Sequence, residues 1–166
     1  MIGVYSLAEL QAAIAREPDR WRPLVFTNGC FDLIHAGHVR YLQTAKALGR
    51  SLVVGLNSDR SIQGIKPQPA GLPQRPIVPE AERAEVLAAL KSVDGVVLFS
   101  EPTATHLITT LQPDIYAKGG DYNIETLPEA PAVQHYGGRI ELVQVEVPSS
   151  TSGIIQRILA AASPPS

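Results

Sequence analysis

The sequence has very little cysteine and almost no net charge. A single cysteine among 166 residues cannot form an internal disulfide, so a reducing compartment is the expected environment. Lysine and arginine (14) nearly balance aspartate and glutamate (16), and no block of like charges occurs, which argues against a nucleic-acid surface or a basic membrane patch. No apolar run approaches the length of a membrane span, and Glu9, Arg16 and Glu17 interrupt the region where a signal peptide would lie. We therefore expect a soluble cytoplasmic protein.

Several catalytic signatures are also missing from the first strand-and-helix region. Neither the Gly-x-Gly-x-x-Gly pattern of dinucleotide-binding proteins nor a Walker Gly-Lys-Ser/Thr follows the first apolar run. A Gly-x-Ser-x-Gly elbow, a Cys/His dyad and a carboxylate pair are absent from the same region, so acyl transfer is not supported.

The remaining composition fits an ordinary globular domain. Apolar residues make up 45% and charged residues 18% of the chain, unlike disordered sequences. We expect one domain over residues 1–166, with a helical extension at 1–22 and a frayed tail at 160–166. Apolar runs alternate with helical patterns, which predicts an α/β, Rossmann-like, doubly wound fold with helices on both faces of a mostly parallel, five-stranded sheet. The expected strands are residues 24–26, 51–56, 96–99, 113–117 and 139–147.

The most informative stretch covers residues 26–38. An apolar run breaks into a polar turn at Asn28-Gly29, and apolar residues then recur at helical spacing until Gly49. This predicts a strand, a glycine turn and a helix whose N-terminus offers free backbone N–H groups to an anion. His35 and His38 stand three residues apart, where a helix places them on one face, and Gly37 between them keeps a side chain from crowding a ligand.

Two imidazoles beside a phosphate-binding helix N-terminus suit a reaction in which negative charge grows on oxygens bound to phosphorus. Donors fixed toward that charge would stabilise the transition state. The plain alternative is that His35 is a satisfied helix-cap histidine and His38 a surface one. The spacing of His-x-Gly-His directly after a strand and a glycine turn favours the functional interpretation.

Polar residues follow two further predicted strands. Asn57-Ser58-Asp59 ends the second strand, and Lys118-Gly119-Gly120-Asp121 ends the fourth. Ligands of open α/β sheets bind at the carboxyl ends of the strands, so both segments should face the crevice that holds the histidines. An ordinary Asn/Asp turn would explain the first segment equally simply, and Gly-Gly-Asp alone is a weak signal.

Residues 63–79 are rich in proline and glycine, which excludes a helix or a central strand and predicts a long binding loop. Its cations, Lys66 and Arg75, are candidates for contact with phosphate or for solvated loop charges. Arg83, in the helix that follows, could bind phosphate or form a surface pair with Glu80. Ser150, Thr151 and Ser152 precede the last helix, where simple N-capping is the alternative to ligand binding.

These motifs carry a family resemblance. Thr27 to Asp32 followed by His35-Ala36-Gly37-His38 resembles the signature of the cytidylyltransferase-like nucleotidyltransferases. Within them, the chain from about Pro23 to Ile158 is most similar to the adenylyltransferase domain that makes ADP-heptose from D-glycero-β-D-manno-heptose 1-phosphate and ATP. Lys-Gly-Gly-Asp-Tyr at 118–122 is a distinguishing feature of those enzymes. The chain departs from the family by an extra Pro-Ala-Gly-Leu-Pro in the proline-rich loop.

The resemblance implies a role for each candidate residue. It implies that the catalytic residues, which hold phosphate oxygens, are His35, His38, Lys66 and Arg83, with Arg75 next in line. It implies acceptor-substrate contacts, or turn-orienting roles, for Asp32, Asn57 and Asp59, and it assigns no protein ligand to a metal. The implied nucleotide-binding residues are Asn28, Gly29, Cys30, Phe31, Gly37, Lys118, Gly119, Gly120, Asp121, Ser150, Thr151 and Ser152.

The implied reaction is transfer of AMP from Mg²⁺-bound ATP to a sugar 1-phosphate, with a separate sugar kinase in the pathway and with a homodimer as one oligomeric state. One alternative is a cytidylyltransferase acting on glycerol 3-phosphate or a similar acceptor, which the lack of an arginine before Ser149 disfavours. The others are a nucleotide-binding module without catalysis and a dehydrogenase, which the missing glycine fingerprint disfavours.

Overall fold

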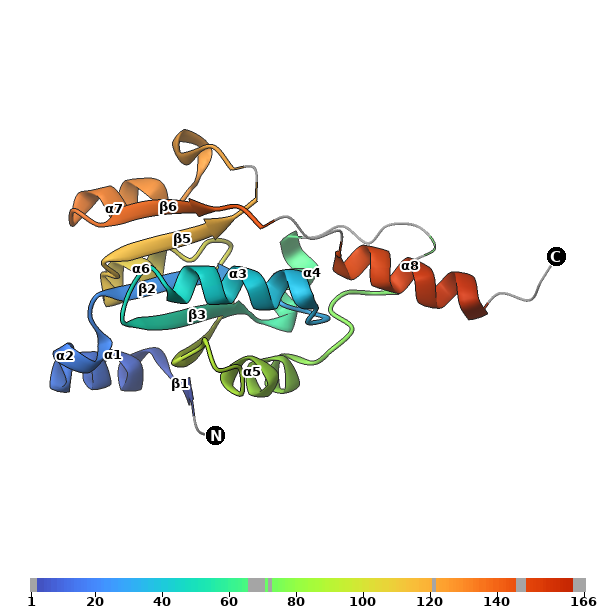
Figure 1. Ribbon diagram of the computed structural model, residues 1–166, viewed down its shortest axis with the longest axis horizontal. Helices are drawn as coiled ribbons and strands as arrows, with labels where there is room; N and C mark the ends of the chain where they lie inside the picture. Colours follow the sequence, from blue (N-terminus) through green and yellow to red (C-terminus); the bar gives the residue numbers. More distant parts are fainter. Residues whose placement is uncertain (1–2, 66–70, 72, 121, 146–148, 163–166) are drawn as a thin grey trace.

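The computed structural model describes residues 3–65, 71, 73–120, 122–145 and 149–162. In this part of the chain, six parallel strands form one sheet in the order β1-β4-β3-β2-β5-β6 (Figure 1). The α/β doubly wound fold is confirmed, but the expected number of five strands is wrong. The strands are β1 (Val4–Tyr5), β2 (Leu24–Gly29), β3 (Ser51–Asn57), β4 (Gly95–Phe99), β5 (Ile115–Gly119) and β6 (Arg139–Val143).

Helices connect the strands and cover both faces of the sheet (Figure 1). They are α1 (Leu7–Arg16), α2 (Pro18–Trp21), α3 (Ala36–Lys46), α4 (Asp59–Ile65), α5 (Glu80–Ala88), α6 (Thr105–Leu111), α7 (Ala130–His135) and α8 (Thr151–Ala162), with a 3₁₀ turn, η1, at Ile124–Thr126. None of these helices, which all lie within the described residues, is long and apolar enough to cross a membrane.

Several elements differ from the sequence prediction. Asn28 and Gly29, which were expected to form a turn, are the last two residues of β2, and β6 ends at Val143 instead of continuing toward residue 147. The sixth strand, β1, has only two residues and pairs with β4, with Val4 opposite Val96. Helix α4 begins at Asp59, where a turn and then a loop were expected. Helix α8 continues to Ala162, so the first residues of the expected frayed tail are helical, while 163–166 lie outside the described chain.

Alternate residues of the strands supply two cores, one on each face of the sheet. On one face, Phe26 of β2 packs with residues of α1, α6 and α7, including Leu107 and Val133. On the other face, Val25 packs with residues of α3 and α5, including Leu42. Side chains alternate across a strand, so neighbouring residues of β2 serve opposite faces. The residues of β3 are all buried, as in a central parallel strand covered on both sides.

Carboxylates fasten the amino ends of two neighbouring strands. Asp114, just before β5, accepts a hydrogen bond from the first backbone N–H of β2, Leu24, at 2.6 Å and pairs with Arg22 at 2.9 Å. Asp94, just before β4, accepts from the N–H of Leu52 in β3 at 2.7 Å, with a lysine side chain as its second donor. These contacts fix the end of the sheet opposite to the expected site.

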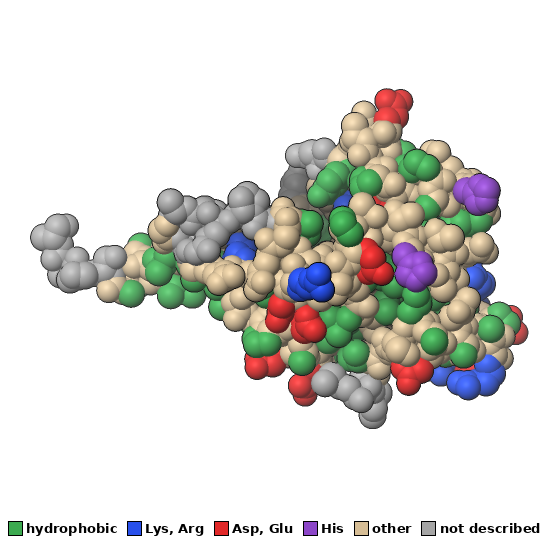
Figure 2. All heavy atoms as spheres, turned by 180° about the vertical axis from the view of Figure 1, so that it is seen from behind, with side chains coloured by type: hydrophobic (Ala, Val, Ile, Leu, Met, Phe, Trp, Pro, Cys, Tyr) green, Lys and Arg blue, Asp and Glu red, His purple; other side chains and the backbone are tan. Residues whose placement is uncertain are grey.

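Helix α8 lies to one side of the sheet and projects from the body (Figure 1). Apolar side chains run along it (Figure 2), and Ile158 is 60% exposed. On the face seen in Figure 2, acidic and basic side chains are intermingled, in line with the small net charge of the sequence.

Candidate active site

A cavity of about 500 Å³ opens at the carboxyl ends of β2, β3 and β5. The predicted site residues that line it are Asn28, Gly29, Cys30, Phe31, Asp32, His38, Asn57, Arg75, Lys118, Gly119 and Thr151. The remaining described candidates do not line the cavity themselves. Six of them stand within three positions of a lining residue in the sequence, namely His35, Gly37, Asp59, Gly120, Ser150 and Ser152. Arg83 is connected to the lining through hydrogen bonds to the carbonyls of Cys30 and Asn57. Two predicted site residues, Lys66 and Asp121, lie outside the part of the chain that the structure describes.

The turn between β2 and α3 is shaped by Phe31. This residue has a left-handed backbone conformation, with φ of 42°, which is uncommon for a bulky side chain. Its ring is buried over Gly29, where an added Cβ would lie 2.9 Å from the ring, and its centroid lies 5.3 Å from that of His38. Close packing of this ring therefore stabilises a strained turn and supports one wall of the cavity.

The two histidines lie face to face at the N-terminus of α3. Their ring centroids are 3.9 Å apart with an interplanar angle of 27°. His35 is the N-cap of α3, and its Nδ1 accepts a hydrogen bond from the backbone N–H of Gly37 at 3.1 Å. A neutral imidazole that accepts at Nδ1 carries its proton on Nε2, so this ring has a donor to offer. His35 is thus a helix cap, as in the plain alternative, and also the partner of a cavity-lining histidine.

Burial lowers the pKa of His35, which favours the neutral ring at neutral pH. Gly37 has no side chain, and this leaves room for the ring of His35, since a Cβ on Gly37 would lie 2.9 Å from Cε1 of His35. The space that Gly37 leaves open therefore accommodates the His35 ring in this structure, whereas the sequence pattern had suggested that a ligand would use it.

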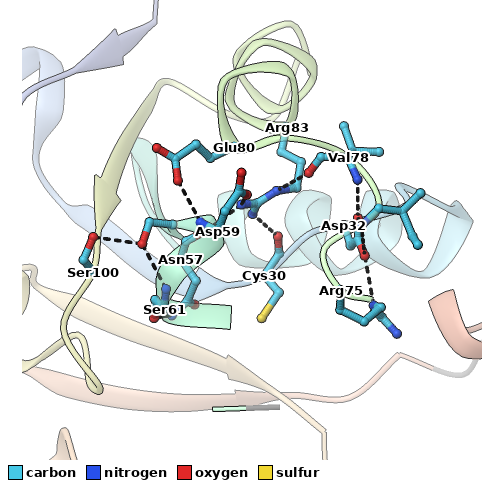
Figure 3. Close-up of polar contacts among 12 residues, drawn as sticks. Cys30, Asp32, Asn57, Asp59, Ser61, Arg75, Val78, Glu80, Arg83 and Ser100 are labelled. Atoms are coloured by element: carbon cyan, nitrogen blue, oxygen red, sulfur yellow. Dashed lines mark hydrogen bonds and ion pairs between the residues drawn. The ribbon is translucent and has the colours of Figure 1, made fainter. Parts of the chain in front are cut away.

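Arg83 is buried, and the alternative of a surface arginine paired with Glu80 is wrong. Its side chain has no exposed surface, and its guanidinium donates four hydrogen bonds within the protein (Figure 3). The acceptors are the carbonyls of Val78 (2.9 Å), Cys30 (2.6 Å) and Asn57 (2.9 Å) and the carboxylate of Asp59 (2.7 Å). The guanidinium therefore joins the β2–α3 turn, the end of β3 and the segment before α5, and its direct contact with phosphate stays a prediction.

The Asn57-Ser58-Asp59 segment starts helix α4 instead of forming a plain turn. The backbone N–H of Asp59 donates to Glu80 at 2.7 Å, while its carboxylate holds Arg83 (Figure 3). Asn57 lines the cavity and donates from Nδ2 to the hydroxyl of Ser61 at 2.9 Å. The side chain of Asp59 is 34% exposed, so this carboxylate is still accessible from solvent.

Asp32 connects the histidine turn to the end of the proline-rich loop. Its carboxylate is 2% exposed and accepts hydrogen bonds from Nε of Arg75 at 2.9 Å and from the backbone N–H groups of Ile77 and Val78, each at 2.9 Å (Figure 3). This supports the interpretation of Asp32 as an orienting residue. Arg75 lines the cavity, so this loop cation is positioned for a ligand.

The end of β5 brings an amine into the cavity. Nζ of Lys118 lies 3.3 Å from Oδ1 of Asn28 and 5.3 Å from the ring centroid of Tyr122. Burial lowers the pKa of Lys118. Gly120 has φ of 96°, a conformation that favours glycine, and a Cβ on Gly119 would lie 2.9 Å from the ring of Tyr41. The two glycines are therefore needed for the shape of this turn.

At the start of α8, the oxygen Oγ of Ser150 accepts from the backbone N–H of Gly153 at 3.0 Å, as expected of an N-cap. Thr151 lines the cavity. Within the described residues, no group of three or more His, Cys, Asp or Glu side chains is arranged to hold a metal ion.

Sequence reasoning missed two polar residues on β5 and α7. Tyr116 is fully buried in the strand, and its hydroxyl donates to Oδ1 of Asn28 at 2.7 Å. Glu129, the N-cap of α7, is 3% exposed yet lines the cavity, and its Oε1 accepts from the backbone N–H of Ala104 at 3.2 Å. Burial is the main cause that raises the pKa of Tyr116, and the nearby charge of Glu129 raises this pKa further. Nothing in the sequence marks Glu129, because a glutamate between two prolines is typical of an exposed turn.

The sequence matches one protein family and several curated relatives. The pattern of the family described as "Cytidylyltransferase-like" matches residues 26–164. The bifunctional protein HldE of Citrifermentans bemidjiense is 51% identical over 157 residues, which cover 95% of this chain and 31% of that protein. HldE of Geotalea uraniireducens is 50% identical and covers 93% and 31%, respectively. The chain thus spans about a third of the length of the curated relatives it matches.

Solved structures share the fold. A lipopolysaccharide core biosynthesis protein from Thermoplasma volcanium superposes with a TM-score of 0.58 at 28% identity, over 75% of this chain and 97% of that one. Pantothenate synthetase from Thermus thermophilus gives a TM-score of 0.56 over 92% of this chain and 64% of that one. At 18% identity, the second likeness concerns the fold alone.

Proposed function

The chain belongs to the cytidylyltransferase-like family, and from this premise we propose that it is a heptose 1-phosphate adenylyltransferase. It would transfer AMP from ATP to D-glycero-β-D-manno-heptose 1-phosphate and release ADP-heptose and pyrophosphate. The relatives at about 50% identity support the subgroup, and the likeness to a lipopolysaccharide core biosynthesis protein supports a product destined for lipopolysaccharide core. Lys-Gly-Gly-Asp-Tyr at 118–122 supports an adenylyl rather than a cytidylyl donor.

The stacked histidine pair at the N-terminus of α3 is the observation that carries this proposal. ATP would lie with its phosphates over this helix end, where backbone N–H groups and the positive end of the helix favour anions. The N–H of Gly37 occupies Nδ1 of His35, so Nε2–H is the donor left for a phosphate oxygen. His38 would act beside it from the cavity wall.

No protein nucleophile is required, because the attacking phosphate is already ionised. The sugar phosphate oxygen would attack the α-phosphorus in line, and pyrophosphate would leave from the opposite side. Catalysis would then consist of positioning and of neutralising charge. Arg75 and Lys118 are the described cations on the cavity, and Lys66 is a further candidate outside the described residues.

Mg²⁺ would enter with ATP, held by the oxygens of the triphosphate, as is usual for this ion. Arg83 would act indirectly in this proposal, by holding together the loops around the cavity. The cytoplasm is the expected compartment. The greater length of the HldE relatives, together with their description as bifunctional, supports a sugar kinase that supplies the acceptor, either fused or separate.

Mass spectrometry tests the proposal directly. The protein is incubated with ATP, Mg²⁺ and D-glycero-β-D-manno-heptose 1-phosphate, and ADP-heptose is the expected product. Pyrophosphate release is then measured with ATP, CTP, GTP and UTP against heptose 1-phosphate, glycerol 3-phosphate and ethanolamine phosphate. Faster turnover with CTP and glycerol 3-phosphate would replace the proposed substrates, and tight ATP binding without any product would indicate a module that has lost catalysis.

A further inference from the structure

The sheet opens between β2 and β5 at the end that carries the cavity. The last residues that pair between these two strands are Phe26 and Tyr116. Beyond this pair, β2 continues beside β3 as far as Gly29, and β5 continues beside β6 as far as Gly119. In the strand order β1-β4-β3-β2-β5-β6, the sheet grows in opposite directions from this point, which is where doubly wound sheets bind their ligands.

The hydroxyl of Tyr41 bridges this opening. Tyr41 belongs to α3, and its hydroxyl oxygen lies 2.7 Å from Oγ1 of Thr27 in β2. The same hydroxyl donates to the carbonyl of Ala117 in β5 at 3.1 Å. Because a phenol has one proton, the Thr27 hydroxyl is the donor of the other bond. Extending the strand register by one residue would pair Thr27 with Ala117, so the phenol lies where the pairing of the two strands has stopped.

Water cannot easily replace these two bonds, because Thr27 and Ala117 are fully buried. Burial raises the pKa of Tyr41 to about 12, so the phenol keeps its proton and remains a donor at neutral pH. A buried polar group that loses its partner costs more free energy than the bond itself contributes. The bridge therefore favours one width of the opening between β2 and β5.

Tyr41 also connects two walls of the cavity. On α3 it stands three residues after His38, so the two side chains lie on one face of the helix. Its ring packs against Gly119, where an added Cβ would lie 2.9 Å from Cε2 of the tyrosine, and both residues line the cavity. One side chain thus joins the helix that carries the histidines to the turn that follows β5.

A second bridge crosses the opening on the other face of the sheet. There the hydroxyl of Tyr116 donates to Oδ1 of Asn28 at 2.7 Å. This contact holds β2 to β5 but involves no residue of α3. Of the two bridges, the one made by Tyr41 is therefore the one that fixes the histidine helix relative to β5.

We propose that Tyr41 is a positioning residue, which sets the distance between the N-terminus of α3 and the turn after β5 so that one nucleotide can contact both. This inference rests on the proposed function and deepens it. The triphosphate would lie over α3, and the rest of the ATP would extend along the cavity toward Lys118 and Gly119. Contacts at two ends of one ligand reinforce each other only when their spacing matches the ligand. An error of about 1 Å in the position of a reacting group can cost about a hundredfold in rate.

The decisive variant is Tyr41→Phe, which keeps the ring beside Gly119 but removes the hydroxyl. NMR titration in the presence of Mg²⁺ measures the Kd of ATP and of two fragments: inorganic tripolyphosphate for the phosphate end and adenosine for the nucleoside end. We expect the Kd of ATP to rise about tenfold or more, while the Kd of each fragment stays within about twofold of wild type. The kcat with ATP and the sugar 1-phosphate should fall about tenfold or more.

Tyr136→Phe is the matched control. The hydroxyl of Tyr136 also donates to a backbone carbonyl, that of Pro113 at 3.0 Å, and burial also raises the pKa of this tyrosine to about 12. This bond lies before the amino end of β5, and neither of its residues lines the cavity. The control should therefore lose stability to a similar extent and leave the Kd of ATP and the kcat unchanged.

Thr27→Val provides a second variant that keeps the test valid even if Tyr41→Phe does not fold. It removes the bond from Thr27 but leaves the bond from Tyr41 to Ala117, so the Kd of ATP should rise by a smaller factor of about three. Combined with Tyr41→Phe, it should add little, because both substitutions break the same bridge.

Two outcomes would overturn the inference. Weaker binding of either fragment to Tyr41→Phe would make Tyr41 a direct ligand contact. A lower melting temperature with an unchanged Kd for ATP and an unchanged kcat would make the bridge purely structural. If wild-type enzyme binds ATP but forms no nucleotide sugar from any sugar 1-phosphate, the proposed function fails, whereas the comparison of ATP with its fragments needs no acceptor and still tests the role of Tyr41.

Discussion

Carboxylates stand at both ends of the parallel sheet, but they have different partners. At the amino ends, Asp114 accepts from the N–H of Leu24, the first residue of β2, and Asp94 accepts from the N–H of Leu52, the second residue of β3. Each carboxylate also pairs with one cation, Asp114 with Arg22 at 2.9 Å and Asp94 with Lys46 at 2.6 Å. These contacts are between elements that are already adjacent. They need no ligand, and they secure the register of the central strands.

At the carboxyl ends of the strands, aspartate and glutamate side chains hold the loops that surround the cavity. Asp32 fixes the end of the proline-rich loop, and Asp59 orients Arg83 beneath the histidine turn. Glu129 lies on the cavity wall itself. At one end of the sheet, charged contacts therefore only hold neighbouring strands together, whereas at the other end they fix the loops that surround the cavity.

Replacing Arg83 should have the largest effect on stability, because its buried guanidinium joins three segments around the cavity. Arg83→Met leaves three backbone carbonyls and the Asp59 carboxylate without their donor. We expect a loss of about 3–5 kcal/mol in the free energy of unfolding, measured by urea denaturation. Unchanged stability with a raised KM for ATP would instead make Arg83 a direct phosphate ligand.

His38→Ala should act on turnover instead of on folding. Loss of one fixed donor to the transition state typically costs about a hundredfold or more in kcat, and we expect a melting temperature close to that of wild type. His106→Ala is the control, since His106 is an exposed histidine on α6. Turnover close to that of wild type in the His38 variant would remove the catalytic role from the histidine pair.

Asp114→Asn, at the amino end of the sheet, should lower stability and leave turnover unchanged. The amide keeps the shape but weakens the bonds to Leu24 and Arg22, at a cost of about 1–2 kcal/mol in stability. The values of kcat and KM should remain unchanged when assayed well below the melting temperature. A change in either constant would show that the two ends of the sheet are coupled.

The smallest expected effect concerns pH. The pKa of His35 is lowered in the folded state, so the unfolded chain binds the proton first as the pH falls. The contribution of His35 to stability is therefore complete above about pH 6.5 and decreases as the pH falls below that value. Melting temperatures of wild type and His35→Gln should converge toward acidic pH. A constant difference across this range would contradict the neutral, capping state of the ring.

Local patterns were sufficient to predict most of the fold, and they indicated several residues that the structure brings to one cavity. The β2–turn–α3 unit follows from an apolar run, a glycine turn and helical spacing, and the resemblance drawn from residues 27–38 is confirmed by the family match. Strand β1 was missed because two residues show no periodicity. Helix α4 was missed because Asn57-Ser58-Asp59 has the composition of a turn and proline-rich chain follows soon after.

The rest of the site depends on contacts between distant segments. The acceptors of Arg83 include Cys30 and Asn57, which are 53 and 26 positions away, so no spacing rule reveals that its side chain is buried. Glu129 meets the cavity only because α7 packs beside α6. Sequence can therefore indicate which residues have suitable chemistry, while long-range packing decides which of them a ligand can reach.

The histidine turn also provides a built-in reporter. Cys30 supplies its backbone carbonyl to Arg83, while its thiol is on a residue that lines the cavity and is the only cysteine of the chain. Alkylation of that sulfur would consequently mark a single, known position. Its rate, slowed by whatever molecule fills the cavity, would give a direct reading of occupancy before any product is formed.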